Sequence, residues 1–296
     1  MQSNQVKFKD KINMKQSKIE YKPSFAAKLA KVILPMLQLT LPEKLYKRTY
    51  DTSYSSYKNL LNLSYNFILA KSYLSGNRID ILRSQLTKQL LPYTMGGRKA
   101  LETAFNTMLL IEQEGINGVI VECGVAEGGT AAMLALANLK AGSYERNKWF
   151  FDSYEGLPEP TQDDYSNGKA GHFIRPLPKG ACLGTIEQVS DLLFNKLSIS
   201  REKTKLIKGW FQNTIPQHTT VIGEIAVLRL DGDWYESTKI PLENFYPLVS
   251  KGGYIIIDDY ATCFGSRKAV DEYLELLNIN AELLPDGRGG AWFRKP

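Results

Sequence analysis

The chain has 296 residues, 43% of them hydrophobic and 23% charged, with a net charge of +6, which suits a soluble protein with a large buried core. Three widely spaced cysteines and two histidines argue against a disulfide framework, a zinc site and a histidine-rich metal centre. The cysteine usage fits a reducing cytoplasm, no apolar run is long enough to cross a bilayer, and the start lacks a signal-peptide pattern, so we expect a cytoplasmic protein.

The positive charge is concentrated at the amino-terminal end. Residues 1–50 hold eleven Lys/Arg and three Asp/Glu, a net charge of +8, whereas the other 246 residues carry −2. We interpret residues 1–23 as disordered or loosely attached and residues 24–39 as a short amphipathic helix, interrupted by Pro35. Such a helix can lie on an anionic membrane surface. It can also pack on its own domain or on a second subunit, which is the interpretation that we favour.

The next segment predicts helices. Residues 50–92 are rich in Tyr, Leu and Asn, and their apolar spacing suits one or two helices. Few basic residues are interleaved with the tyrosines, so we expect no nucleic-acid partner. A loop at residues 93–97 leads into a helix over 98–114. We therefore divide the chain into residues 1–90, a basic and partly disordered extension with lid helices, and residues 91–296, the main domain.

The main domain alternates short apolar runs with amphipathic stretches. Runs without polar alternation are typical of parallel strands covered on both faces. Strands are expected at residues 118–123, 148–151, 205–208, 225–230 and 254–257, followed by a hairpin of residues 281–284 and 291–294. Helices are expected from Thr130 and over residues 186–197 and 266–277, with a long loop over a site at 156–181. This order predicts an open, doubly wound α/β fold with a mostly parallel, seven-stranded sheet.

Carboxylates follow two of these strands directly. Asp231 and Asp233 come after the fourth strand, and Asp258 and Asp259 after the fifth. Because the carboxyl ends of parallel strands share one edge of the sheet, these side chains should converge where α/β proteins bind ligands. Crowded like charges imply a cation, a shared proton or a cationic ligand, and a divalent metal is the simplest of these. The alternative, that such acids cap helices or form turns, explains one strand end better than two.

A glycine turn follows the first strand. It begins at Gly124 and places backbone N–H groups and a helix N-terminus beside a ligand. Asp152, after the second strand, can accept hydrogen bonds from a ribose. These features do not separate NAD from S-adenosylmethionine, although G-x-x-x-G-G is not the dinucleotide fingerprint. Glu122 suits a cationic amino-acid moiety; alternatively, it is a strand-end acid that bonds to a neighbouring loop.

Five segments together resemble the macrocin O-methyltransferase family. They are VECGVAEGG, FDSYEGLPEP, GWFQNTIP, LRLDGDWYEST and GGYIIIDDY, and the similarity extends from about Tyr93 to Tyr273. The phrases DGDWYEST and IIDDY, in this order, are much more specific than a glycine loop. The family includes the mycinamicin and novobiocin sugar O-methyltransferases. The resemblance implies a class I methyltransferase fold that binds S-adenosylmethionine and Mg²⁺ and methylates a hydroxyl, usually on a deoxysugar.

The resemblance also implies roles for individual residues. The metal ligands would be Asp231, Asp258 and Asp259. The cofactor-binding residues would be Thr94, Met95, Glu122, Gly124, Asp152, Ser153 and Trp210. Thr94 and Met95 match a loop that reaches the methionine end of the cofactor. Family members often read GVWRGG where this chain reads GVAEGG, so Ala126 and Glu127 replace an aromatic residue and an arginine.

The expected chemistry agrees with a metal site. A sugar hydroxyl is a poor nucleophile because its pKa is far above neutral, and coordination to a divalent cation would make it more acidic and fix its oxygen. Asp231 is our candidate for the catalytic residue that accepts the proton, and water or His172 are the alternatives.

The residues around this site have more than one interpretation. Trp210 and Phe211 form either an adenine or substrate wall or part of the core. Asp233 and Glu236 are interpreted as turn and helix-start residues. Arg267 would either pair with the carboxylates after the fifth strand or reach the substrate.

Two functions remain open at this point. One is a metal-dependent O-methyltransferase acting on a sugar or similar polyhydroxyl acceptor. The other is a non-catalytic or peripheral-membrane binding module that keeps the fold and attaches through the basic segment. The crowded carboxylates favour the enzyme, because a binding module has no need of them. Self-association through the amino-terminal segment is compatible with either function.

Overall fold

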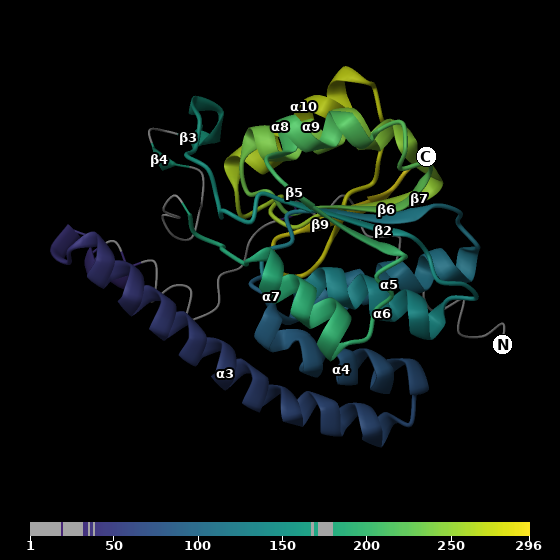
Figure 1. The fold of residues 1–296 in the computed structure, drawn as a ribbon, viewed down its shortest axis with the longest axis horizontal. Helices are drawn as coiled ribbons and strands as arrows, with labels where there is room; N and C mark the ends of the chain where they lie inside the picture. The colour runs from purple at the N-terminus through teal and green to yellow at the C-terminus, as the bar shows by residue number, and fades with distance from the viewer. Residues whose placement is uncertain (1–18, 20–31, 35, 38, 167–168, 171–179) are drawn as a thin grey trace.

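The computed structural model describes residues 19, 32–34, 36–37, 39–166, 169–170 and 180–296. Within these residues a central sheet lies between two layers of helices (Figure 1). Its order is β5-β2-β1-β6-β7-β9-β8; the first five strands are parallel, and β9 is antiparallel to both of its neighbours, β7 and β8. The strands are β1 Val119–Cys123, β2 Lys148–Asp152, β5 Thr204–Lys208, β6 Ile225–Leu230, β7 Val249–Ile257, β8 Leu284–Pro285 and β9 Ala291–Arg294. The predicted doubly wound, mostly parallel sheet is confirmed.

Helices cover both faces of the sheet (Figure 1). One layer holds α5 Gly97–Glu114, α6 Gly129–Ala141 and α7 Ile186–Ser190, which continues as a π-helical turn, Asp191–Lys196. The other layer holds α8 Phe211–His218, α9 Tyr235–Phe245 and α10 Phe264–Leu276. Short 3-10 turns occupy Leu91–Tyr93, Gln162–Asp164 and Tyr246–Leu248, and a small separate hairpin pairs β3 Tyr165–Ser166 with β4 Lys169–Ala170.

The core is divided by the sheet. Ile120 and Phe150 belong to the hydrophobic cluster on the α5–α6 side, whereas their neighbours Val121 and Phe151 belong to the cluster on the α8–α10 side. Successive side chains of a strand point to opposite faces. Because both faces are covered by helices, every residue of β6 is buried, which explains the continuous apolar runs in the sequence.

The amino-terminal extension stacks outside the α5–α6 layer. Helix α3 Glu43–Ser75 packs on α4 Arg78–Leu90, and α4 in turn packs on α5 and α6. Asn77 is the N-cap of α4: its side-chain oxygen accepts the N–H groups of Ile79 and Asp80. No helix among the described residues is long and apolar enough to cross a membrane.

Several boundaries differ from the sequence-based expectation. Strand β7 begins at Val249 rather than residue 254, because a register shift and the positive φ of Gly252 (77°) let the glycine-containing segment remain in the strand. The helix predicted at 186–197 changes from α to π winding after Ser190. Of the helix predicted at 24–39, residues 32–34, 36–37 and 39 are helical, and the rest lies outside the described residues.

Candidate active site

A cavity of about 540 Å³ opens at the carboxyl ends of the parallel strands. Most of the residues predicted for the site lie in its wall: Met95, Gly124, Asp152, Ser153, Trp210, Asp231, Asp258 and Asp259. Thr94 lies next to the wall and is 6% exposed. Its hydroxyl accepts the N–H of Gly96 at 3.2 Å, which shapes the loop beside the cavity. The structure therefore brings most of the predicted residues together around one cavity.

The glycine turn is held close to β6 and to Asp152. A side chain at Gly124 would place its Cβ 1.9 Å from the carbonyl oxygen of Asp231, and its φ is 93°. Only glycine fits this approach. Asp152 Oδ2 accepts the N–H groups of Val125 (2.7 Å) and Ala126 (2.9 Å), and Oδ1 accepts that of Tyr154 (2.7 Å). A carboxylate has about four acceptor positions, so Asp152 can order the turn and still accept from a ribose hydroxyl.

Glu127, one of the two residues that depart from the family pattern, has a partner in the amino-terminal extension. Lys58 of α3 lies 2.5 Å from the Glu127 carboxylate and donates to the carbonyl oxygen of Pro92 at 3.1 Å. The negative charge of Glu127 in the glycine turn is therefore balanced by Lys58, which also connects α3 to the turn.

Glu122 lies beneath the turn. It is fully buried, and its Oε1 accepts from Thr130 Oγ1 and from Arg229 Nη1, each at 2.5 Å. Burial raises the pKa of Glu122 to about 7, although Arg229 acts in the opposite direction. Its Oε2 is buried without a hydrogen-bond partner among the described residues. Glu122 thus bonds to helix α6 and strand β6, and not to a neighbouring loop as the alternative interpretation had it, and it keeps one oxygen for a further donor.

Arg229 was missed by the sequence analysis, although it links three strands. Its Nη1 lies 2.5 Å from Glu122 Oε1 and 2.9 Å from Asp231 Oδ2, and its Nη2 lies 2.7 Å from Asp258 Oδ1. Its side chain is 1% exposed. The available signal was a single arginine inside the otherwise apolar run IAVLRL, since a buried charge needs partners.

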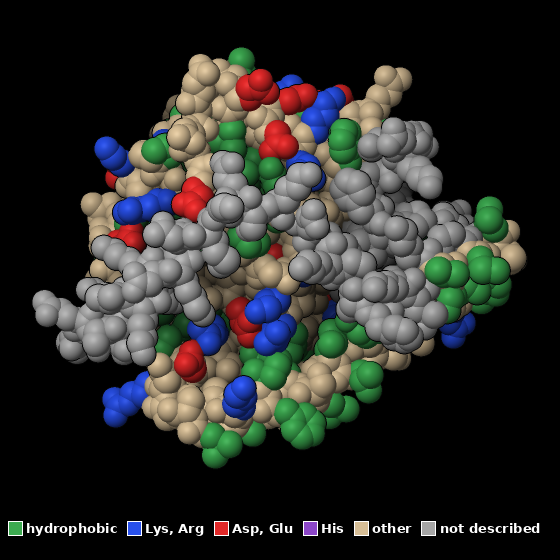
Figure 2. All heavy atoms as spheres, turned by 180° about the vertical axis from the view of Figure 1, so that it is seen from behind, with side chains coloured by type: hydrophobic (Ala, Val, Ile, Leu, Met, Phe, Trp, Pro, Cys, Tyr) green, Lys and Arg blue, Asp and Glu red, His purple; other side chains and the backbone are tan. Residues whose placement is uncertain are grey.

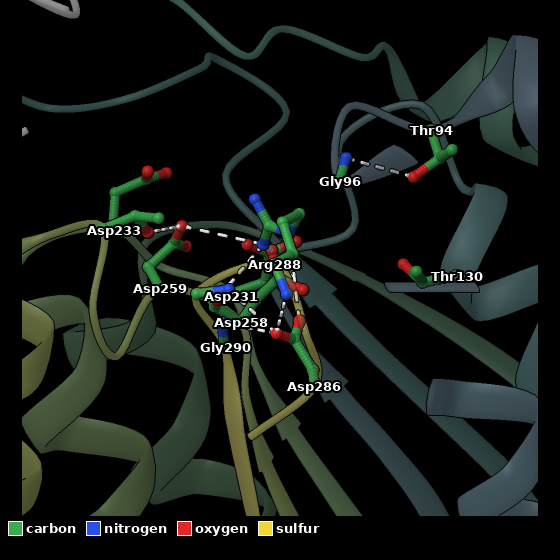
Figure 3. A network of polar contacts seen from close by, with 12 residues as sticks. Thr94, Gly96, Thr130, Asp231, Asp233, Asp258, Asp259, Asp286, Arg288 and Gly290 are labelled. Atoms are coloured by element: carbon green, nitrogen blue, oxygen red, sulfur yellow. Dashed lines mark hydrogen bonds and ion pairs between the residues drawn. The ribbon is translucent and has the colours of Figure 1, made fainter. Parts of the chain in front are cut away.

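Asp231, Asp258 and Asp259 come together as predicted. Each offers an oxygen within 4.8 Å of the others, and Figure 3 shows these carboxylates gathered at the strand ends. Burial, followed by the nearby acids, raises the pKa of Asp259 to about 7 and also raises that of Asp231. Burial raises the pKa of Asp258 too, but Arg288 and Arg229 outweigh it, so the pKa is lowered.

The donor set suits a hard divalent cation. Asp259 Oδ1 accepts from Thr262 Oγ1 at 2.7 Å, whereas its Oδ2 is buried and has no hydrogen-bond partner among the described residues. A buried, unpaired carboxylate oxygen beside two further carboxylates is costly unless a cation joins it. The three aspartates therefore fit Mg²⁺, which prefers oxygen ligands.

Arg288 is the second residue that the sequence analysis missed. It lies in the loop between β8 and β9 and contacts Asp258 Oδ2, and its Nη2 also donates to the Asp258 carbonyl oxygen at 2.9 Å. The loop is shaped by Asp286, whose Oδ1 accepts the N–H groups of Arg288 (2.6 Å), Gly289 (2.9 Å) and Gly290 (2.9 Å). Figure 3 shows Arg288 reaching from this loop into the aspartate cluster.

Other predicted residues have different surroundings. Arg267 lies 3.9 Å from Asp271 and over the ring of Tyr260, so its predicted pairing with the carboxylates after β7 is wrong. Phe211 belongs both to the cavity wall and to the core, so both interpretations of it hold. His172 lies outside the described residues.

Asp233 and Glu236 have the predicted positions. Asp233 lies in the turn before α9, with a φ of 59°, and Cys263 Sγ donates to its Oδ1 at 3.5 Å. Glu236 is in the first turn of α9. Both residues also line the cavity. Their positions in the turn and at the helix start are therefore compatible with contact to a bound ligand as well.

The sheet order, the glycine turn after β1 and the carboxylate at the end of β2 are those of the class I methyltransferase fold. The comparisons with known proteins identify the family. Residues 31–295 match the Macrocin-O-methyltransferase (TylF) family, and the chain belongs to it. It is therefore an O-methyltransferase that uses S-adenosylmethionine, and the resemblance seen in the sequence is confirmed.

Similar proteins match about two thirds of the chain. Over 204 residues the chain is 35% identical to demethyldecarbamoylnovobiocin O-methyltransferase of Streptomyces niveus, covering 69% of this chain and 76% of that protein. Over 208 residues it is 32% identical to mycinamicin III 3''-O-methyltransferase of Micromonospora griseorubida, covering 69% and 78%. The solved structure of the O-methyltransferase NovP superposes with a TM-score of 0.60 at 34% identity, covering 69% of this chain and 82% of that one.

Proposed function

We propose that the protein is a metal-dependent enzyme that moves a methyl group from S-adenosylmethionine to a hydroxyl of a sugar or similar polyhydroxyl acceptor. The observation that carries this proposal is the position of the Asp231, Asp258 and Asp259 oxygens, within 4.8 Å of one another, in the same cavity as the glycine turn. The names of relatives that act on sugar-bearing antibiotics support the acceptor class.

The donor side of the cavity is formed by the turn and the end of β2. Bound there, S-adenosylmethionine supplies an electrophilic methyl group. Asp152 would accept from the ribose, and Trp210 and Ser153, which line the same wall, would contact the adenosine. The unpaired Oε2 of Glu122 could receive the ammonium group, provided that the loop carrying Thr94 and Met95 admits it.

The acceptor side is formed by the three aspartates, which would hold Mg²⁺. Bound there, Mg²⁺ lowers the pKa of a hydroxyl and fixes its oxygen. Asp231 is the most exposed of the three, at 25% against 5% for Asp258 and 7% for Asp259. It is therefore the carboxylate best placed to accept the acceptor's proton.

Calorimetry tests this assignment of the two sides. The protein should bind S-adenosylhomocysteine and should not bind NAD, with or without Mg²⁺. In the same calorimetric experiment, Mg²⁺ should bind to the wild-type protein and should not bind to the Asp259→Asn variant. Tight NAD binding, or Mg²⁺ binding that survives this substitution, would contradict the proposal.

The amino-terminal extension has a separate role in this proposal, which is self-association. Helix α3 exposes apolar side chains that are 66–89% accessible and recur at intervals of three, four and seven residues: Leu60, Leu63, Phe67 and Leu74. Figure 2 shows hydrophobic side chains along the lower edge of the molecule, where α3 lies. This spacing is that of a helix–helix seam, and a two-fold axis would place the stripe of one copy on that of another.

The competing role for the extension is contact with an anionic membrane surface, and the alternative function is a binding module without catalysis. The described part of α3 exposes an apolar stripe, which favours another helix as its partner. The buried carboxylate cluster favours catalysis. The cytoplasmic location expected from cysteine usage remains part of this proposal.

A further inference from the structure

Arg288 places a positive charge inside the carboxylate cluster. Its Nη2 contacts Asp258 Oδ2 and lies 4.0 Å from Asp259 Oδ1. These two aspartates belong to the group of three whose oxygens lie within 4.8 Å of one another. Arg288 Nη2 therefore lies next to the space between the three carboxylates, where a cation would bind.

The backbone that carries Arg288 is fixed, whereas its side chain is long. Asp286 holds the backbone N–H groups of the loop, and Gly289 accepts the N–H of Ala261 at 2.7 Å. A side chain at Gly290 would place its Cβ 2.8 Å from the Asp258 carbonyl oxygen, so the loop lies directly against the end of β7. The four-bond arginine side chain, 24% exposed, is the part that can swing into the cavity it lines.

Arginine and metal would use the same oxygen. Arg229 Nη2 engages Asp258 Oδ1 at 2.7 Å, and Arg288 engages Oδ2, so both oxygens of this carboxylate already bond to a guanidinium. Mg²⁺ binds carboxylate oxygens at about 2.0–2.1 Å. A divalent ion at that distance from Asp258 Oδ2 would repel the guanidinium nitrogen now in contact with it.

We propose that Arg288 is the resident counter-ion of this site, and that a divalent cation binds by displacing its guanidinium from Asp258. The inference rests on the metal role proposed above. Arg288 thereby stabilises the metal-free protein, in which three crowded carboxylates, two of them buried, would otherwise repel one another, and it lowers the affinity for metal by competition. By linkage, removing the competitor strengthens metal binding.

Calorimetric titration with Mg²⁺ and thermal unfolding test the proposal on wild type, Arg288→Met and the matched control Arg267→Met. The control substitution removes the same charge nearby, but Arg267 pairs with Asp271 and not with the aspartates of the proposed metal site. We expect Arg288→Met to bind Mg²⁺ about tenfold more tightly than wild type. Its Tm without metal should fall below that of wild type, and Mg²⁺ should raise it by more. Arg267→Met should match the wild-type Mg²⁺ affinity.

A second measurement uses the unaltered protein. Phenylglyoxal modification, mapped by mass spectrometry, should label Arg288 faster when Mg²⁺ is present, because the displaced guanidinium is exposed. Equal labelling with and without Mg²⁺, or a Mg²⁺ affinity of Arg288→Met no higher than that of wild type, would overturn the inference while leaving the metal site intact. Absence of Mg²⁺ binding in wild type and both variants would instead remove the metal proposal itself.

Discussion

Asp231, Asp258 and Asp259 carry the same functional group in three different surroundings. Asp258 lies between two guanidinium groups, which lower its pKa, whereas the pKa of Asp259 is raised to about 7 by burial and neighbouring acids. Asp231 shares Arg229 with Glu122 and faces the cavity. These differences suit a division of labour in which Asp258 is the permanently ionised ligand and Asp231 the one that meets the acceptor.

Loss of charge at Asp231 should stop turnover. We expect Asp231→Asn to abolish methyl transfer while S-adenosylhomocysteine affinity is retained, because the carboxylate serves the acceptor rather than the donor. Asp233→Asn is the matched control, since Asp233 lies two residues after Asp231 and outside the proposed ligand set, and it should change activity little. Rate measurements with calorimetry of both variants check this, and equal damage from the two would show that Asp231 has only a structural role.

Asp152 should matter for the donor. Its carboxylate both orders the turn, through Val125 and Ala126, and faces the ribose position. Asp152→Ala should therefore weaken binding of S-adenosylmethionine and S-adenosylhomocysteine by about 1–3 kcal/mol. Asp152→Asn keeps one acceptor oxygen and should lose less. If calorimetry gave wild-type affinity for Asp152→Ala, the proposed ribose contact would be absent.

At the scale of elements, Arg229 joins β1, β6 and β7 beneath the cavity, and this predicts a pH-dependent stability. The pKa of Glu122 is raised to about 7 by burial, so the folded protein keeps a proton that the unfolded chain loses above about pH 4.5. This group's contribution to stability is fully present below about pH 4.5 and is lost as the pH rises through about 7.

Urea unfolding in chelator, at pH 4.5 and at pH 8, should show this loss in wild type relative to Glu122→Gln. The stability difference between the two proteins should change by about 3 kcal/mol over this range, since the pKa of Glu122 is raised from 4.5 to about 7 and each pKa unit corresponds to about 1.4 kcal/mol. Parallel pH curves for both proteins would mean that Glu122 is ionised throughout the range.

The strands were predictable and the ion pairs between them were not. Apolar runs ending in Asp231 or Asp258 reveal strand ends, because a run covered on both faces has no polar alternation. Two of the three partners of Arg229 come from other strands: Glu122 from β1 and Asp258 from the residue after β7. Glu122 is 107 residues away in sequence. Only the parallel register, which places Glu122 opposite Arg229, brings them together. Arg288 depends likewise on a hairpin folding back onto β7.

The apolar stripe of α3 should control the oligomeric state. Phe67 is 82% exposed, and Phe67→Glu would place a charge in the proposed seam. We expect light scattering to show a dimer for wild type and a monomer for this variant, with unchanged helix content. Ser55→Glu, which adds the same charge at an exposed position of α3 away from the stripe, is the control for charge alone. A monomeric wild type, or wild-type binding to anionic vesicles that Phe67→Glu abolishes, would contradict self-association.

At the scale of the whole molecule, the positive charge and the candidate site lie in different parts of the chain. The net charge of +8 lies in residues 1–50, whereas the remaining 246 residues, which include every residue proposed for the site, carry −2. The amino-terminal extension of residues 1–90 meets the main domain at Lys58 and Glu127, where α3 is fastened to the glycine turn. The extension therefore supports the turn from outside, and the cavity is built by the main domain.

The most direct test of the account is the metal dependence of methyl transfer. Transfer of labelled methyl from S-adenosylmethionine to a panel of deoxysugar glycosides should be measured with excess chelator, and again after Mg²⁺ or Mn²⁺ is restored. The account predicts that transfer stops in chelator, while S-adenosylhomocysteine remains bound, and returns with either metal. Undiminished transfer in excess chelator would show that Asp231, Asp258 and Asp259 serve the structure and not the reaction.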